Sequence, residues 1–171
     1  MVQVRVAGVA LDAAQQHVIL LRPVGPSVFA HTVLPVWIGA QEATSILVAV
    51  EGVTPPRPLA HDLMVRLVEA LDGAVERVEV TKVEDGTFFA EVTLFTPHGL
   101  RVIDARPSDA IALASRLDAP IWVAEAVLAE AGVPDDMVAE EDDSDADSND
   151  DERMSEFRRF LDDVEPEDFE K

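Results

Sequence analysis

The 171-residue sequence contains no cysteine, so it can hold no disulfide framework, no thiolate metal site and no cysteine nucleophile. No apolar run reaches the length that spans a bilayer, and no basic segment followed by an apolar run opens the chain. The P-loop, the dinucleotide glycine pattern, the zincin motif and the nucleophile elbow are all missing. We therefore expect a soluble cytoplasmic protein without an organic cofactor and without a membrane partner.

Basic residues are scarce, with 13 lysines and arginines against 34 acidic residues. Residues 135–171 hold 18 of these acids and 4 of these bases, a net charge of −14, and residues 1–134 hold 16 acids and 9 bases, a net charge of −7. The bases form no cluster of the kind that binds the phosphates of duplex DNA. This distribution argues against tight, sequence-specific duplex recognition.

The chain does have enough apolar residues, 48% of the total, for one core. We expect an α+β domain over residues 1–134 and a disordered acidic linker over 135–151, which has almost nothing to bury. Residues 152–171 form a short amphipathic segment that could dock on its own domain, on a second copy or on a partner. Its apolar residues are Met154, Phe157, Phe160, Leu161 and Phe169.

Hydrophobic periodicity predicts a mixed, mainly antiparallel sheet with helices packed on it. Strands are predicted at residues 2–8, 17–22, 34–39, 75–83, 87–96, 100–103 and 120–123, and helices at 41–50, 59–71, 110–117 and 124–131. The turn at Asp85-Gly86 makes residues 75–103 an antiparallel meander, and its first hairpin is expected at the centre of the sheet. Leu63, Leu67 and Leu71 mark an apolar stripe on the second helix.

Two strand-to-helix or loop-to-helix corners carry more polar groups than a cap requires. In the first, Pro107 ends a strand and opens a helix, next to Asp104, Arg106, Ser108 and Asp109. Asp109 falls in the first helical turn, where it could serve as a simple cap and dipole partner. Asp104 and Arg106 are not needed for capping, which makes a functional role the sharper hypothesis for this corner.

The second corner is a proline-rich approach followed by the helix at 59–71. Arg57 precedes this helix, and His61 and Asp62 lie in its first turn. A lone histidine is more often structural than functional, but the three residues together strengthen a functional interpretation. Glu42, in the first turn of the preceding helix, can equally be read as a dipole partner.

If these corners converge, they supply the groups that phosphodiester cleavage needs. Carboxylates hold a hard divalent cation such as Mg²⁺ or Mn²⁺, which activates water, and arginine clamps a phosphate. The candidate catalytic residues are His61, Asp62, Asp104 and Asp109, with His61 as general acid or base. The candidate substrate-binding residues are Arg57, Arg106 and Ser108, and the candidate metal ligands are Glu42, Asp62 and Asp104.

Four segments resemble the bifunctional nuclease family: LPVWIGAQEA at 34–43, PPRPLAHDL at 55–63, GTFFAEVTL at 86–94 and DARPSDAIALA at 104–114. The resemblance covers residues 2–134. It implies an α+β domain that usually forms a homodimer and a nuclease activity on DNA and RNA. Because basic residues are few, we expect the binding of nucleic acid to be weak and nonspecific. The resemblance points to the same signature positions, namely Glu42, Arg57, His61, Asp62, Asp104, Arg106, Ser108 and Asp109.

The alternative hypothesis is a non-catalytic binding or regulatory domain, in which the arginine and aspartate corners are ion pairs that hold the fold together. The acidic surface and the missing basic groove favour it. Location discriminates between the two hypotheses. Side chains that converge on an open pocket favour chemistry, whereas mutual burial favours a scaffold.

Overall fold

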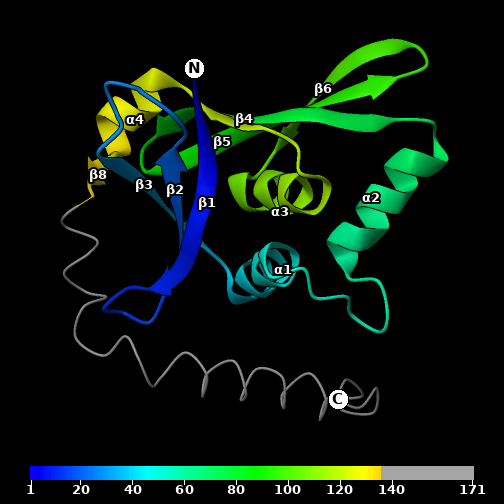
Figure 1. Ribbon diagram of the computed structural model, residues 1–171, viewed down its shortest axis with the longest axis horizontal. Helices are drawn as coiled ribbons and strands as arrows, with labels where there is room; N and C mark the ends of the chain where they lie inside the picture. The colour runs from blue at the N-terminus through cyan, green and yellow to red at the C-terminus, as the bar shows by residue number, and fades with distance from the viewer. Residues whose placement is uncertain (136–171) are drawn as a thin grey trace. The chain divides into compact units, whose positions relative to one another are not determined.

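The computed structural model describes residues 1–135 and shows an α+β domain over Met1–Pro134 (Figure 1). Its strands are β1 (Val2–Leu11), β2 (His17–Pro23), β3 (Thr32–Ile38), β4 (Ala74–Glu84), β5 (Thr87–Thr96), β6 (Gly99–Ala105), β7 (Ile121–Val123) and β8 (Val133–Pro134). Its helices are α1 (Ala40–Val50), α2 (Ala60–Ala70), α3 (Pro107–Leu117) and α4 (Glu125–Ala131). The expected acidic linker, apart from Asp135, and the amphipathic segment at 152–171 lie outside the described residues.

The strands form one sheet in the order β6-β5-β4-β7-β1-β2-β3-β8. Neighbouring strands are antiparallel except β4 and β7, which are parallel, so the mixed, mainly antiparallel sheet expected from the sequence is confirmed. The β4–β5 hairpin turns at Asp85 and Gly86, whose φ angles of 50° and 75° are those of a tight turn matched to strand twist. The predicted meander over 75–103 is therefore present.

The core lies between the sheet and three helices, α1, α3 and α4. Cross-strand neighbours such as Val78 with Val92 and Val80 with Ala90 point inward and are buried against Ile111 of α3. Figure 1 shows α1 and α3 next to each other on one side of the strands, with α2 farther out. This arrangement brings the starts of α1, α2 and α3 within reach of one another.

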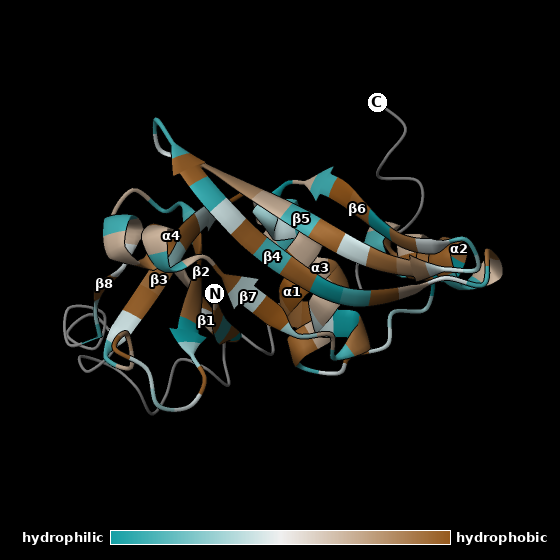
Figure 2. Cartoon of the chain, turned by 90° about the horizontal axis from the view of Figure 1, so that it is seen from above, coloured by the Kyte–Doolittle hydropathy of each residue, from teal (hydrophilic) through white to brown (hydrophobic). Residues whose placement is uncertain are grey.

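One expectation about packing is wrong. The β4–β5 hairpin is not the centre of the sheet, because β5 is second from the β6 edge and β7 with β1 lies between the two halves. The leucine stripe of α2 does not face the core: Leu63, Leu67 and Leu71 are 53%, 54% and 74% exposed. Figure 2, coloured by hydropathy, shows α2 at the end of the sheet where β4 begins.

None of the four helices in the described part of the chain has both the length and the apolar composition needed to cross a bilayer.

Candidate functional site

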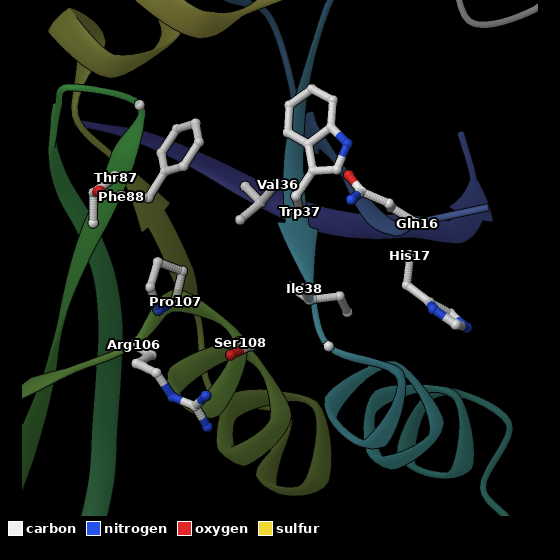
Figure 3. Close-up of a pocket in the computed structure, with 12 residues that line it drawn as sticks. Gln16, His17, Val36, Trp37, Ile38, Thr87, Phe88, Arg106, Pro107 and Ser108 are labelled. Carbon is white, nitrogen blue, oxygen red and sulfur yellow. The ribbon is translucent and has the colours of Figure 1, made fainter. Parts of the chain in front are cut away.

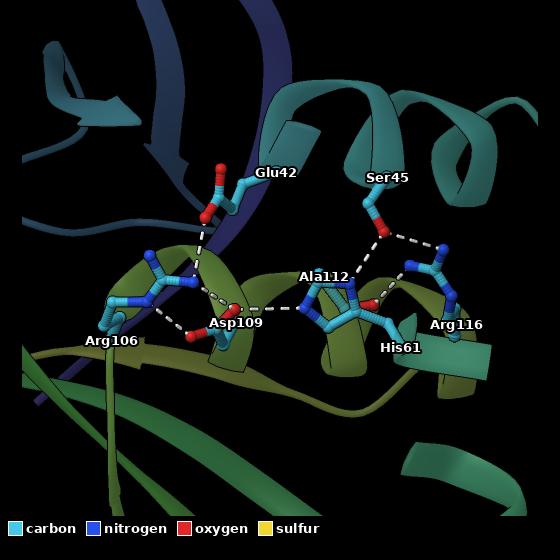
Figure 4. A network of polar contacts seen from close by, with 7 residues as sticks. All are labelled: Glu42, Ser45, His61, Arg106, Asp109, Ala112 and Arg116. Carbon is cyan, nitrogen blue, oxygen red and sulfur yellow. Dashed lines mark hydrogen bonds and ion pairs between the residues drawn. The ribbon is translucent and has the colours of Figure 1, made fainter. Parts of the chain in front are cut away.

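Seven side chains from the starts of α1 and α2 and from α3 form a continuous chain of polar contacts, and Figure 4 draws all of them except Asp62. In order, the chain runs Glu42, Arg106, Asp109, His61, Ser45, Arg116 and Asp62. It ties α1 and α2, which follow each other in the sequence, to the distant helix α3. One end is open to solvent and the other is buried, so the two ends have different chemistry.

The open end is the Arg106 guanidinium, whose side chain is 65% exposed. Its Nε donates to Asp109 Oδ2 at 2.7 Å and its Nη2 donates to Asp109 Oδ1 at 3.0 Å. The same Nη2 lies 2.8 Å from Glu42 Oε1. The two-point contact holds the planar guanidinium in one orientation, as bidentate arginine–carboxylate pairs do.

The electrostatics of this end follow from the same contacts. Burial raises the pKa of Asp109, but the hydrogen bonds from Arg106 and His61 and the charge of Arg106 outweigh it, so the pKa lies below its usual value. The hydrogen bond to Asp109 and the nearby carboxylates raise the pKa of Arg106. Both groups are therefore charged across the physiological range.

The middle of the chain is His61, which is 6% exposed and has both ring nitrogens engaged. Asp109 Oδ1 lies 3.1 Å from Nε2, and Ser45 Oγ lies 2.8 Å from Nδ1. A carboxylate only accepts hydrogen bonds, so Nε2–H donates to Asp109 and a neutral imidazole accepts the Ser45 hydroxyl at Nδ1. Arg116 Nη2 donates to Ser45 Oγ at 2.9 Å, which completes a consistent set of donors.

The buried end is an ion pair between Arg116 and Asp62, with 2.6 Å between Nε and Oδ1. Arg116 also donates from Nη1 to the Ala112 carbonyl, and Asp62 Oδ2 accepts the Leu59 N–H at the start of α2. Burial raises the pKa of Asp62, but the hydrogen bonds from Arg116 and Leu59 lower it more. This end holds α2 against α3 and has the features of a scaffold.

A cavity of about 550 Å³ lies at the open end (Figure 3). Strands β3 and β5, which are separated by four others in the sheet, both contribute to it, so the sheet curls around this space. Arg106, Pro107 and Ser108 at the start of α3 line the cavity. Ser108 is 6% exposed, and no hydrogen bond to its hydroxyl is found within residues 1–135. Figure 3 shows this hydroxyl near the cavity.

The structure brings together five of the eight predicted residues in the polar chain, and a sixth, Ser108, lines the adjoining cavity. Arg57 and Asp104 stay outside. Arg57 is exposed and makes no ion pair within residues 1–135. Asp104 is exposed on β6 and faces Glu91 of β5 across the strands.

The predicted metal ligands Glu42, Asp62 and Asp104 do not converge. Within residues 1–135, no group of three or more histidine, aspartate or glutamate side chains is arranged to hold a metal ion. Glu42 pairs with Arg106, Asp62 pairs with Arg116, and Asp104 lies on a strand outside the polar chain. The predicted three-residue metal site is therefore not formed by these side chains.

Four residues at the site were missed by the sequence reasoning: Ser45, Arg116, Trp37 and Phe88. The spacing along a helix could have indicated two of them. Ser45 lies three residues after Glu42, and Arg116 lies seven residues after Asp109, so the residues of each pair lie on the same helix face. Trp37 and Phe88 belong to strands whose approach depends on the curl of the sheet. No local pattern reports that curl.

These observations define a class: an α+β domain whose curled, mainly antiparallel sheet covers helices joined by a polar chain that opens onto a cavity. The chain belongs to the bifunctional nuclease domain family, whose model matches residues 19–136. Over 170 residues it is 41% identical to the uncharacterized proteins MT1877 and Rv1829 of Mycobacterium tuberculosis, strains CDC 1551 / Oshkosh and ATCC 25618 / H37Rv. The match covers 98% of this chain and 97% of each relative.

Proposed function

We propose that this domain hydrolyses phosphodiester bonds of DNA and RNA with little sequence specificity, and that the cavity at the start of α3 binds the strand. The observation that carries this proposal is the Arg106 guanidinium, which is held rigid by Asp109 and Glu42 and yet is largely exposed beside a cavity. A purely structural arginine would be expected to bury its guanidinium, as Arg116 does. Family membership supports the same reaction class.

Three groups at this end can contact a phosphate. Arg106 uses Nε and Nη2 for its carboxylate partners, which leaves Nη1 as a donor. The Ser108 hydroxyl can donate from the cavity wall. In the first turn of α3, Pro107 has no N–H and the next two N–H groups after Ser108 donate to the Arg106 carbonyl, so the turn adds the Ser108 N–H and the positive end of the helix dipole. Because the carboxylates of Glu42 and Asp109 are close by and repel an anion, we expect phosphate binding to be weak, and contacts to phosphate carry no sequence information.

Charge stabilisation and water activation would then fall to different residues. Arg106 stabilises the negative charge that builds on the phosphoryl oxygens, a role in which one lost donor costs about 100- to 1,000-fold in rate. Glu42 uses Oε1 for Arg106, so Oε2 is the oxygen that can accept a proton from water. His61 has both nitrogens engaged and acts as a positioning residue that orients Asp109.

The experiment is a cleavage assay with purified full-length protein on single-stranded DNA and RNA. We expect Arg106→Ala to lower the rate about 100-fold or more, and Arg101→Ala, which removes an exposed arginine on β6, to leave it unchanged. Equal rates for Arg106→Ala and wild type would reject this site. Metal dependence stays a prediction, and a parallel arm with chelator and added Mg²⁺ or Mn²⁺ tests it.

A second candidate is a non-catalytic binding domain, and the buried Arg116–Asp62 pair with its Ser45 and His61 neighbours favours it. These groups satisfy one another and leave nothing for a substrate. A wild-type protein that binds a strand but never cleaves it would support this candidate. The open end of the polar chain thus favours a hydrolase, and the buried end favours a non-catalytic binding domain. The cleavage assay separates these two hypotheses.

We further propose a homodimer through a surface on α2 and the edge strand β6, called here the α2–β6 surface. It consists of Leu63, Met64, Leu67, Leu71 and Ile103, each between 41% and 74% exposed. Ile103 pairs with the buried Val92 and so lies on the helix-covered face of the sheet. At roughly half exposure these side chains present apolar area on the order of 400 Å², about half of the ~800 Å² per partner of a stable interface, and pairing along β6 would supply the rest. β6 is also an edge strand with unpaired backbone groups, which a second β6 can pair.

A further inference from the structure

Two aromatic residues at the cavity have no role in the reaction proposed above. Trp37 comes from β3 and Phe88 from β5, and both line the cavity with Arg106 and Ser108. Figure 3 shows the two rings on the two sides of the cavity, with the start of α3 on a third side. The space therefore has aromatic walls next to the corner that is proposed to bind phosphate.

Trp37 is unusual because it is both exposed and fixed. Trp37 is 53% exposed, yet its indole Nε1–H donates to Asp12 Oδ2 at 2.9 Å. The other oxygen of Asp12 accepts the backbone N–H groups of Ala14 and Gln16 at 2.8 and 2.9 Å. The hydrogen bond from Gln16 and that from Trp37 hold the pKa of Asp12 below its usual value, so the anchor is ionised.

A rigid, exposed aromatic face is costly to leave in water and is suited to stacking against a flat ligand. Every nucleobase has such a face, and proteins that bind single strands without sequence preference stack bases on aromatic side chains. The volume of about 550 Å³ is in the range of small-molecule pockets, about 300–1,000 Å³, and suits a nucleotide rather than a duplex.

We propose that Trp37 and Phe88 form a stacking platform for one unpaired nucleobase, and that the phosphate next to this base contacts Arg106 and Ser108. The proposal rests on the proposed function and names its substrate class, single-stranded nucleic acid. A base inside a duplex is already stacked on its neighbours and cannot enter. Asp12 is a positioning residue, since it contacts the indole and not the ligand.

Stacking has a readout that does not depend on cleavage, because a base stacked on an indole quenches its fluorescence. The chain has two tryptophans, and the second, Trp122, lies on β7 and does not line the cavity. The variant Trp122→Phe leaves Trp37 as the single reporter. The probes are oligothymidylate, a strand of equal length with abasic sites, and a duplex of equal length.

We expect saturable quenching of Trp37 by oligothymidylate, with at least tenfold weaker binding of the abasic strand and the duplex. By fluorescence anisotropy of a labelled strand, Trp37→Ala should weaken binding about tenfold or more. Trp37→Phe should restore most of the affinity, and Trp122→Phe should match wild type. Asp12→Ala should give an intermediate loss, because the indole remains but is no longer held.

Equal binding of abasic and normal strands, no quenching, no binding at all, or an unchanged Trp37→Ala variant would each overturn the platform. These outcomes are distinguishable from failure of the proposed function. Quenching without cleavage in any condition would reject the hydrolase and keep the platform. Equal cleavage rates for single strands and duplexes would reject the platform and keep the hydrolase.

Discussion

Asp109 is the central residue of the site, because it contacts the exposed Arg106 on one side and the buried His61 on the other. Asp109 therefore links the buried part of the polar chain to the part that lies beside the cavity. A carboxylate that accepts hydrogen bonds from two partners is stabilised in its charged form. This stabilisation has a measurable consequence for folding, in addition to any role in catalysis.

We expect Asp109→Asn to lower the free energy of unfolding at pH 7 by about 1–3 kcal/mol. The pKa of Asp109 is depressed in the folded state, so its stabilisation is fully present above the unfolded pKa of about 3.9 and is lost as the pH falls through the folded value. The difference between wild type and Asp109→Asn should therefore shrink below about pH 4. Urea denaturation at a series of pH values measures it.

The matched control is Asp104→Asn, which changes an exposed aspartate of β6 outside the polar chain. It should leave the free energy of unfolding within about 0.5 kcal/mol of wild type at every pH. A constant difference between wild type and Asp109→Asn down to pH 2 would contradict the assigned ion pair.

At the scale of elements, the start of α2 depends on one side chain. Asp62 accepts the Leu59 N–H, which is the reciprocal contact of a capping box, and it also pairs with Arg116 of α3. The helix has no other capping side chain at its N-terminus and packs only one side against α3, while its leucines face outward. Substitution of Asp62 should therefore weaken the attachment of α2 to the domain more than substitution of an exposed residue on this helix.

We expect Asp62→Ala to cost about 3 kcal/mol or more in the free energy of unfolding, since it leaves the Arg116 charge buried without its carboxylate. Asp62→Asn should cost less, because the amide oxygen can still accept the Leu59 N–H. Glu69→Ala, an exposed acid on the same helix, is the control. Urea denaturation compares the three, and similar values for Asp62→Ala and Glu69→Ala would contradict the role.

At the scale of the whole molecule, the α2–β6 surface is the proposed interface between two copies of the chain. The apolar stripe of α2 obeys the helical period expected of a core face, yet the rest of the chain within residues 1–135 leaves it exposed. An exposed apolar helix face and, within residues 1–135, an unpaired edge strand are both features through which a second copy of the chain can bind.

We expect the full-length protein to have twice the mass of one chain in light scattering, and Leu67→Asp to have the mass of one chain. The added charge would have to be buried at the interface, which costs far more than one rim contact contributes. Val28→Asp, at a valine that is 94% exposed outside the α2–β6 surface, should remain a dimer. A monomeric wild type would reject the homodimer and leave the surface to another partner.

The local elements could be predicted from sequence because their signals are local. Proline at the start of α3, the Asp-Gly turn of the β4–β5 hairpin and the apolar periods placed nearly every helix and strand. The first-turn positions of Glu42, His61, Asp62 and Asp109 were also readable, because caps and helix starts depend on a few neighbouring residues. The family could be recognised from four short segments, and the match confirms it.

Pairing across the molecule was decided by the tertiary structure. The sequence could not show that Asp62 pairs with Arg116 while His61 pairs with Asp109, or that Asp104 faces away on β6. The curl of the sheet, which brings Trp37 and Phe88 to one cavity, arises from the summed twist of many strands. Patterns within a strand determine which face is apolar, whereas the partner of that face depends on contacts between residues far apart in the chain.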